Sequence, residues 1–244
     1  LYASAELEPV AIAEAASVDT RVTVQRGDVA GVILLHAAAR RADLIVLGVG
    51  QHDGRRYRFS SIAERVVRGG PCPTLVVPEG PHSAAEPFEN IVCAVDFSPA
   101  SHAAVHHALR LAQRSERRLT LLHVVDGPGP DDHSQYPWLA AHEYYRSLGV
   151  TALEQLQALI PLRERALVLA RVVVGSAVTE ILRLAGTTDA RLLVIGARPR
   201  SRIGRRLFGR TGLLLRRANC PVLAVPEPAR AQAEDHEGRR KLAA

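Results

Sequence analysis

The sequence predicts an α/β fold: an open five-stranded parallel sheet with helices on both faces, occurring as a tandem repeat. Short apolar runs rich in Val, Leu and Ile alternate with longer amphipathic segments. This order is typical of a parallel sheet whose strands are buried on both faces by crossover helices. Landmark residues also recur at one fixed offset along the 244 residues, which indicates a duplicated unit.

The repeat has a period of 148 residues. Four landmark positions carry the same residue type in both copies, namely Gly27 and Gly175, Gly48 and Gly196, Cys72 and Cys220, and Pro78 and Pro226. A period this long indicates duplicated domains rather than a short-repeat solenoid. We expect a partial first domain over 1–79, a linker over 80–87, a complete second domain over 88–228 and a disordered tail over 229–244.

The first domain is expected to be incomplete. Counting back one period from Phe88 places its start about 60 residues before Leu1. Its first strand, first helix and second strand would then be missing, and the absence of methionine agrees with a piece of a longer protein. The remaining part predicts strands at Arg21–Val24, Leu44–Leu47 and Thr74–Val77, and helices over Leu1–Ala16, Val29–Ala39 and Ser61–Arg68.

The second domain contains all five strands of the predicted sheet. Ser98 is the expected N-cap of its first helix, with Pro99 at the first helical position. The predicted strands are Asn90–Asp96, Leu119–Val125, Ala166–Val174, Leu192–Ile195 and Val222–Val225. Helices are expected from Pro99 to about Arg114, over Trp138–Ile160 with an irregularity near Gly149, over Ser176–Ala185 and over Gly209–Ala218.

Composition and charge exclude several classes of protein. The net charge is +6, but the arginines are spread along the chain with few aromatic residues between them, so no specific nucleic-acid partner is expected. No apolar run approaches the ~20 residues of a membrane span. Three cysteines are too few for a disulfide framework or a zinc ribbon. A reducing, cytoplasmic location is therefore expected.

Ligand-binding residues are expected at the carboxyl ends of the second domain's strands, where open parallel sheets bind ligands. Asp96 can accept a hydrogen bond from a ribose or a base edge, and the backbone at Val124 can pair with an adenine edge. Glycines and a helix N-terminus suit a phosphate. The candidate binding residues are Asp96, Phe97, Ser98, Val124, Gly196, Pro199, Gly209, Arg210 and Thr211.

The pattern resembles the universal stress proteins in their tandem form. The resemblance rests on Val92–Ser101 (VCAVDFSPAS), Leu121–Val125 (LLHVV), Asp43–Gly48 (DLIVLG), Ser61–Val67 (SIAERVV) and Cys72–Pro78 (CPTLVVP), and it extends over about residues 5 to 228. It implies a Rossmann-like fold of the adenine nucleotide alpha hydrolase type and a role as a stress-response sensor or effector. It also implies adenine and ribose contacts at Asp96 and Val124, phosphate contacts in the glycine loop, and Mg²⁺ only together with ATP.

Both halves depart from the family's glycine loop. In the second half Gly196 and Gly209 match, Pro199 replaces the middle glycine and lacks an N–H donor, and Arg210 takes the Ser or Thr position ahead of Thr211. In the first half Gln51 replaces the middle glycine, and Ser60-Ser61 replaces Gly-Ser. The arginines over Arg198–Arg210 either replace the lost backbone contacts to an anion or form a solvated loop.

Three functions remain open on the sequence alone. The first is a nucleotide-dependent sensor with at most slow ATP hydrolysis, and the second is an interaction module of the same fold without a nucleotide. The third, an ATP-using enzyme, is disfavoured because Asp96–Ser101 lacks the SGGxDS-type loop of such enzymes. No catalytic residue and no metal site is assigned, since His102 and His106 have no third ligand. The final strands Thr74–Val77 and Val222–Val225 are expected to pair or lie close, and a homodimer is a further expectation.

Overall fold

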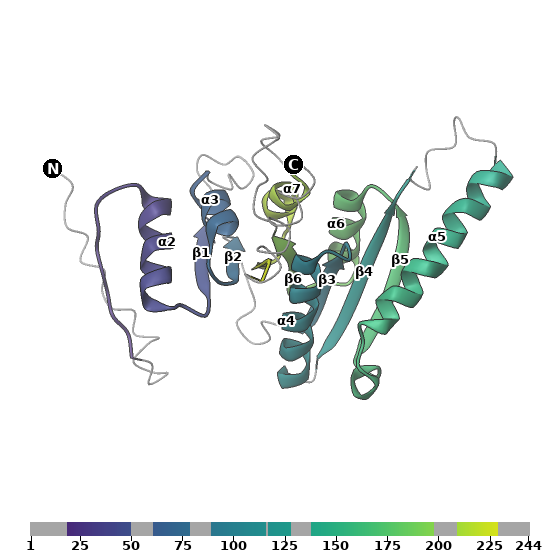
Figure 1. Ribbon diagram of the computed structural model, residues 1–244, viewed down its shortest axis with the longest axis horizontal. Coiled ribbons are helices and arrows are strands. Elements are labelled where there is room, and N and C mark those ends of the chain that lie inside the picture. Colours follow the sequence, from purple (N-terminus) through teal and green to yellow (C-terminus); the bar gives the residue numbers. More distant parts are fainter. Residues whose placement is uncertain are drawn as a thin grey trace, which may run out of the picture.

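One continuous sheet runs through the molecule. The computed structural model describes residues 19–49, 61–78, 89–115, 117–127, 138–197 and 209–228. Within these residues seven strands lie in the order β1-β2-β7-β6-β3-β4-β5 (Figure 1). We call the described residues up to Pro78 the first half and those from Glu89 onward the second half.

The second half forms a parallel sheet of five strands, as predicted. The strands β3 (Asn90–Val95), β4 (Arg118–Asp126), β5 (Val168–Gly175), β6 (Leu192–Ala197) and β7 (Val222–Pro226) lie in the order β7-β6-β3-β4-β5. All four neighbouring pairs are parallel. The chain moves from β3 outward to β4 and β5 and then returns to the other side of β3. The strand order therefore reverses between β3 and β6.

The first half adds two strands, so the sheet has seven strands rather than five. Strands β1 (Ile45–Val49) and β2 (Thr74–Pro78) are parallel to each other. Strand β2 is antiparallel to β7, with Leu75 opposite Leu223. These two strands are the ones that the sequence expects to lie close. Each would otherwise be a short apolar edge, and pairing removes both edges.

The β2–β7 pairing has two-fold character. Leu75 and Leu223 are equivalent positions of the 148-residue repeat, and they lie opposite each other. On either side, Thr74 faces Ala224, which is the repeat counterpart of Val76, and Val76 faces Val222, which is the repeat counterpart of Thr74. A local two-fold axis therefore passes between Leu75 and Leu223, and relates the two halves as it would relate the subunits of a symmetric dimer.

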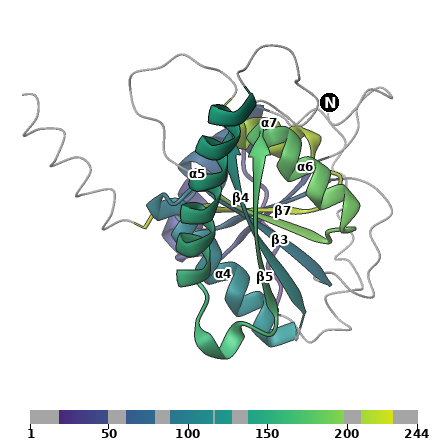
Figure 2. The ribbon, with the colours of Figure 1, turned by 90° about the vertical axis from the view of Figure 1, so that its right-hand side faces the viewer.

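The helices cover the two faces of the sheet (Figure 2). Helices α4 (Pro99–Ser115) and α5 (Trp138–Ala158) pack on one face, which buries Ile91, Cys93 and Leu121. Alternate residues of the strands point to the opposite face, where they pack against α6 and α7. Those two helices are α6 (Ala177–Thr187) and α7 (Arg210–Arg217).

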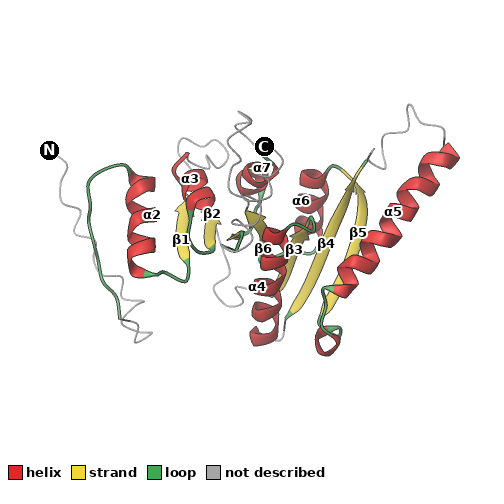
Figure 3. Ribbon diagram, viewed as in Figure 1, coloured by secondary structure: helices red, strands yellow, loops and turns green. Residues whose placement is uncertain are grey.

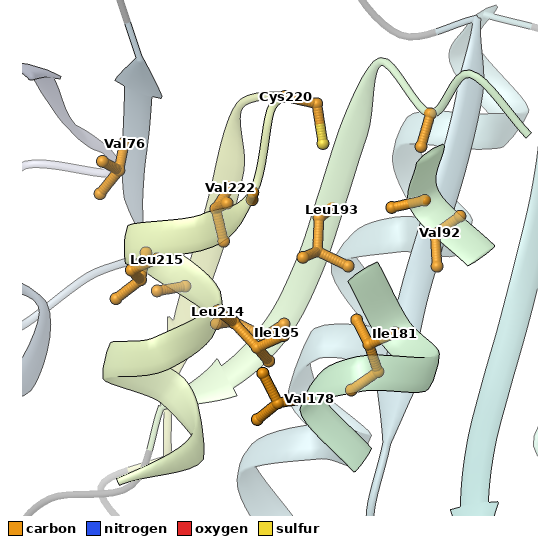
Figure 4. Packing of buried hydrophobic residues seen from close by; sticks show 14 of the residues in the cluster. Val76, Val92, Val178, Ile181, Leu193, Ile195, Leu214, Leu215, Cys220 and Val222 are labelled. Atoms are coloured by element: carbon orange, nitrogen blue, oxygen red, sulfur yellow. The ribbon is translucent and has the colours of Figure 1, made fainter. Parts of the chain in front are cut away.

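The face carrying α6 and α7 has a core shared by both halves. Leu214 of α7, Ile195 of β6 and Val178 of α6 gather around one point, and Val76 of the first half belongs to the same cluster (Figure 4). Helix α3 (Ser61–Gly69) contributes Ala63 and Val67 to that cluster. Helix α2 (Val29–Arg40) packs with α3 on the same face (Figure 3). The halves are thus joined by packing as well as by strand pairing.

Backbone geometry supports the equivalence of the repeat positions. Gly27 has φ 143° and Gly175 has φ 153°, conformations that L side chains rarely adopt. Each glycine leads into a helix through a cap residue, Asp28 before α2 and Ser176 before α6. Asp28 accepts a hydrogen bond from Gly31 N at 3.1 Å, which satisfies one free N–H of the first turn.

One predicted strand is wrong. Arg21–Val24 form no strand, and the side chains of Val22 and Val24 are 57% and 83% exposed. Their second-half counterpart, β5, pairs with β4. The described part of the first half contains no strand equivalent to β3 or β4, so the apolar alternation at Arg21–Val24 has no neighbouring strand to pair with. The first helix, expected over Leu1–Ala16, lies outside the described residues.

The predicted irregularity at Gly149 is also wrong, because α5 runs unbroken from Trp138 to Ala158. A glycine in a helix costs roughly 1 kcal/mol relative to alanine, and the burial of Ala152 and Leu156 on the next turns offsets this. The segments 80–87, 128–137, 198–208 and 229–244 lie outside the described residues. Among the helices that the structure describes, none has the length and apolar character of a membrane span.

The three cysteines lie in the interior of the folded protein. Cys72, Cys93 and Cys220 are free and buried. Desolvation raises the pKa of the Cys220 thiol to about 11 and that of Cys93 further still. At pH 8 only about one Cys220 in a thousand would be thiolate, the reactive form. We expect iodoacetamide to leave all three cysteines unmodified in native protein, as measured by mass spectrometry.

The same reagent in urea is the control and should modify all three within minutes. Rapid alkylation of Cys220 in the native protein would contradict the buried placement at the start of β7.

Candidate functional site

A cleft opens at the carboxyl ends of β3, β4 and β6, on the face that carries α6 and α7. Its volume is about 100 Å³. It lies where the strand order reverses, the usual ligand position in an open parallel sheet. The lining residues come from β3 and the turn after it, and from α4, β4, α6, β6 and α7: Ala94, Val95, Asp96, Ser101, Leu122, Val124, Ala177, Ile181, Ile195, Gly196, Arg210, Thr211 and Leu214.

Five of the nine residues predicted from the sequence line this cleft. They are Asp96, Val124, Gly196, Arg210 and Thr211. They come from segments separated by up to 115 positions, and the topology brings them together. Gly209 directly precedes the lining residue Arg210 and is the N-cap of α7. Pro199 lies outside the described residues, and the other two predicted residues have different surroundings.

The turn after β3 holds Asp96 in place. Its Oδ1 accepts hydrogen bonds from the backbone N of Ser98, at 3.1 Å, and from the Ser98 hydroxyl. The Ser98 Oγ accepts in turn from Ser101 N at 3.2 Å, so Ser98 caps α4 as predicted. Ser98 is 5% exposed. Its place is therefore structural: it orients the Asp96 carboxylate at the cleft while lying behind it.

Phe97 points to the other face of the sheet. Its φ of 58° turns the chain from β3 toward α4. Its ring packs on His123, with centroids 4.6 Å apart, within the apolar cluster under α4 and α5. His123 Nδ1 donates to the Val95 carbonyl at 2.8 Å. Phe97 thus supports the turn and does not line the cleft.

The two glycines of the loop have different surroundings. A Cβ on Gly196 would lie 2.7 Å from the backbone of both Ala100 and Ser101, so β6 and the start of α4 approach too closely for any side chain. Among the residues that the structure describes, no heavy atom would lie within 4 Å of a Cβ on Gly209. The packing of the protein alone explains Gly196, whereas no described residue occupies the space in front of Gly209 at the N-terminus of α7.

An ion pair lies across the mouth of the cleft. Arg210, the first residue of α7, contacts the carboxylate of Asp126 at the end of β4. Their side chains are 65% and 57% exposed, and exposed pairs contribute only ~0.2–1 kcal/mol. An anion entering the cleft can therefore compete with Asp126 for the Arg210 guanidinium at small cost.

The equivalent positions of the first half are apolar. One repeat period before Arg210 and Thr211 stand Ile62 and Ala63. The polar contact nearby is a bidentate pair in which Arg65 donates to Asp28 at 2.7 and 2.6 Å. This guanidinium holds the pKa of Asp28 below its ordinary value. The two carboxylate oxygens are thereby engaged, and the first half lacks the cations and hydroxyls of the cleft.

Sequence reasoning missed several lining residues. Ala177 and Ile181 lie one turn apart on α6, and Leu214 lies on α7. Their apolar spacing was visible, but it is the same as that of ordinary core residues. Asp126 was missed as the partner of Arg210 because the two are 84 positions apart. His102 and His106 belong to no metal-binding group among the residues that the structure describes.

The comparisons with known proteins decide the family. The model of the universal stress protein family matches residues 2–78 and 87–226. The chain belongs to the universal stress protein family. Universal stress proteins of Mycobacterium tuberculosis and Mycobacterium bovis are 32% identical to it over 101 residues, which is 41% of this chain and 32% of each relative. The match thus spans about a third of the length of these curated relatives.

Solved structures show the same fold. A universal stress protein from Archaeoglobus fulgidus superposes with a TM-score of 0.62 at 19% identity, covering 88% of this chain and 74% of that one. A protein of unknown function from Pseudomonas aeruginosa superposes with a TM-score of 0.64 at 18% identity, covering 95% and 82%. At these identities the likeness establishes the shared fold alone. The ligand of this universal stress protein has to be inferred from its own residues.

The two glycines should respond differently to substitution. Gly196→Ala would force a Cβ against the backbone of α4, and overpacking of this kind costs about 1–3 kcal/mol. Gly209→Ser would enter open space and supply a good N-cap, so we expect the free energy of unfolding to change by less than about 0.5 kcal/mol. Urea unfolding followed by circular dichroism measures both.

Equal losses for the two variants would contradict the assignment of Gly196 to packing and Gly209 to open space.

Proposed function

We propose that the second half binds an adenine nucleotide in the cleft and that the protein acts as a stress-response sensor or effector whose state follows the bound nucleotide. The observation that carries the proposal is the gathering of Asp96, Val124, Arg210 and Thr211 around one cleft at the point of strand reversal. Membership of the universal stress protein family supports it. Free, buried cysteines agree with action in the reducing cytoplasm.

In the proposed complex each part of the nucleotide has its own contacts. The adenine edge pairs with the backbone at Val124, and the ribose hydroxyls donate to the Asp96 carboxylate. The phosphates lie toward Gly209 and Thr211, where the first N–H groups of α7 and the Arg210 side chain supply positive charge. Mg²⁺ enters only with the phosphates of ATP, since the described residues contain no metal-binding group of their own.

The second candidate is an interaction module of the same fold that binds no nucleotide. The observation that favours it is the size of the cleft, about 100 Å³, compared with ~300–1,000 Å³ for pockets that enclose drug-sized ligands. On the proposed function the remaining part of the nucleotide lies outside the cleft, beyond the Arg210–Asp126 pair. The two candidates therefore differ in whether ATP binds at all.

We expect the purified protein to release an adenine nucleotide on denaturation, detected by mass spectrometry, and to bind ATP below millimolar concentration in calorimetric titration. Gly209→Val should weaken ATP binding at least tenfold, because its side chain fills the space before α7. Asp96→Asn should weaken it about 10- to 100-fold, since a hydrogen bond to a charged group contributes ~1.5–3 kcal/mol.

The asparagine keeps an acceptor for Ser98 N, so unfolding curves should show Asp96→Asn to be folded like the wild type. Absence of binding below millimolar ATP would favour the interaction module. Binding that survives both substitutions would place the nucleotide elsewhere.

Asp126→Asn should strengthen binding of ATP by about 1.4- to fivefold, the range set by the ~0.2–1 kcal/mol of an exposed ion pair. The substitution frees Arg210 for the phosphates without touching the adenine or ribose contacts. Binding of adenosine should not change. Calorimetry with ATP, AMP and adenosine measures the difference.

Arg210→Gln is the matched variant and should weaken ATP binding while leaving adenosine unaffected. A change of the same size for adenosine and ATP would contradict phosphate contact at Arg210.

A further inference from the structure

A single carboxylate lies at the boundary between the two halves, close to the local two-fold axis. Glu64 of α3 forms an ion pair with Arg68 of its own helix through Oε1 and with Arg216 of α7 through Oε2, the latter at 3.5 Å. The three side chains are 17%, 25% and 32% exposed. They are therefore better shielded from water than the pair at the mouth of the cleft, and their charges interact more strongly.

The two arginines are equivalent residues of the repeat. Arg68 and Arg216 are 148 positions apart and meet at one carboxylate from opposite sides of the axis. The repeat counterpart of Glu64 is Gly212. Among the described residues, the one heavy atom within 4 Å of a Cβ on Gly212 would be Glu64 Oε1, at 3.9 Å. Gly212 thus leaves room for the carboxylate of the other half.

We propose that Glu64 makes the pairing of the two unlike halves selective. The α7–β7 surface binds a partner that presents a carboxylate to Arg216, and it does not bind a second copy of itself. In a symmetric pairing of two α7–β7 surfaces, two Arg216 side chains would meet beside two glycines. Such a pairing would bring two partly buried positive charges together and would remove the contact with Glu64, which is unfavourable. In the internal pairing Glu64 contacts both arginines. Strand pairing alone is nearly symmetric in its chemistry and does not supply this selectivity.

The pairing of β2 with β7 needs such a determinant because its register involves only Thr74–Val76 and Val222–Ala224. Backbone hydrogen bonds between short strands carry little information about the partner. The side chains of α3 and α7 lie over that pairing and contribute to the same apolar cluster. The ion pairs of Glu64 with Arg68 and Arg216 therefore lie at the interface between the two halves.

The test moves the carboxylate from one half to the other in the full chain. Glu64→Ala should lower the thermal midpoint by about 3–8 °C, at ~2–4 °C per kcal/mol for a chain of this size, and should speed amide exchange in β2 and β7 at least tenfold. Exchange in β3 and β4 should change much less. Adding Gly212→Glu to Glu64→Ala puts a carboxylate back between Arg68 and Arg216 and should recover most of the loss.

Glu64→Ala with Gly212→Gln is the matched control, because glutamine has the same length and the same helical gain over glycine without the charge. It should recover clearly less than the glutamate variant, and the difference should shrink in 1 M NaCl. Equal recovery by glutamate and glutamine would overturn the proposal. So would a midpoint that falls by less than about 2 °C for Glu64→Ala, the result expected if Glu64 only pairs within α3 at ~0.2–0.5 kcal/mol.

Discussion

The antiparallel pairing of β2 with β7 is the interaction on which the architecture depends. It joins a two-stranded sheet to a five-stranded one at Leu75 and Leu223, which are the same position of the repeat. Because these residues lie opposite each other, every contact near them is close to a two-fold relation, and α3 is brought beside α7. The apolar cluster that contains Val67, Val76 and Leu215 exists only because of this placement.

The two halves that this pairing joins differ in which strands and helices their described residues contain. In the second half α4 covers β6, and Val194 is fully buried. Its counterpart Val46 on β1 is 58% exposed, because the described part of the first half has no helix equivalent to α4. A cleft of the kind found beyond β3, β4 and β6 needs the ends of three adjacent parallel strands. Within the described residues only the second half provides them, so the polar residues of the candidate site and the strands that position them occur together.

Local chemistry made most of the fold predictable from the sequence. Apolar runs and amphipathic periods gave all seven strands and six of the helices, and the glycines at 27 and 175 share a positive φ. The prediction of a strand at Arg21–Val24 was wrong, since alternation alone does not show whether a neighbouring strand exists. The domain boundaries and the nucleotide contacts remain predictions.

The candidate site was predictable in its position and less so in its details. Topology places strand ends together, so Asp96, Val124 and Gly196 could be found from their place after apolar runs. The reason that position 196 is a glycine could not be predicted from the sequence. It is the close approach of β6 to the backbone of Ala100, which is set by the packing of β6 on α4. The contact of Arg210 with Asp126 depends on where two distant elements end. Phe97 lies on the same face as Cys93 and Val95, in the cluster under α4 and α5, and its role in binding stays a prediction.

The first turns of α3 and α7 show how a duplicated helix is adapted to two tasks. Residues 62–64 are Ile-Ala-Glu, and the equivalent residues 210–212 are Arg-Thr-Gly. In α7 the first two positions line the cleft and the third is a glycine that leaves room for the opposite half. In α3 the first two are apolar, and the third is the carboxylate that fills that room. Three adjacent positions thus account for two differences between these helices: α7 has the Arg-Thr pair at the cleft, and α3 has the carboxylate at the axis. An identical pair of helices could not meet both requirements, because a carboxylate at position 212 would add negative charge close to the proposed phosphate site and crowd Glu64 at the axis.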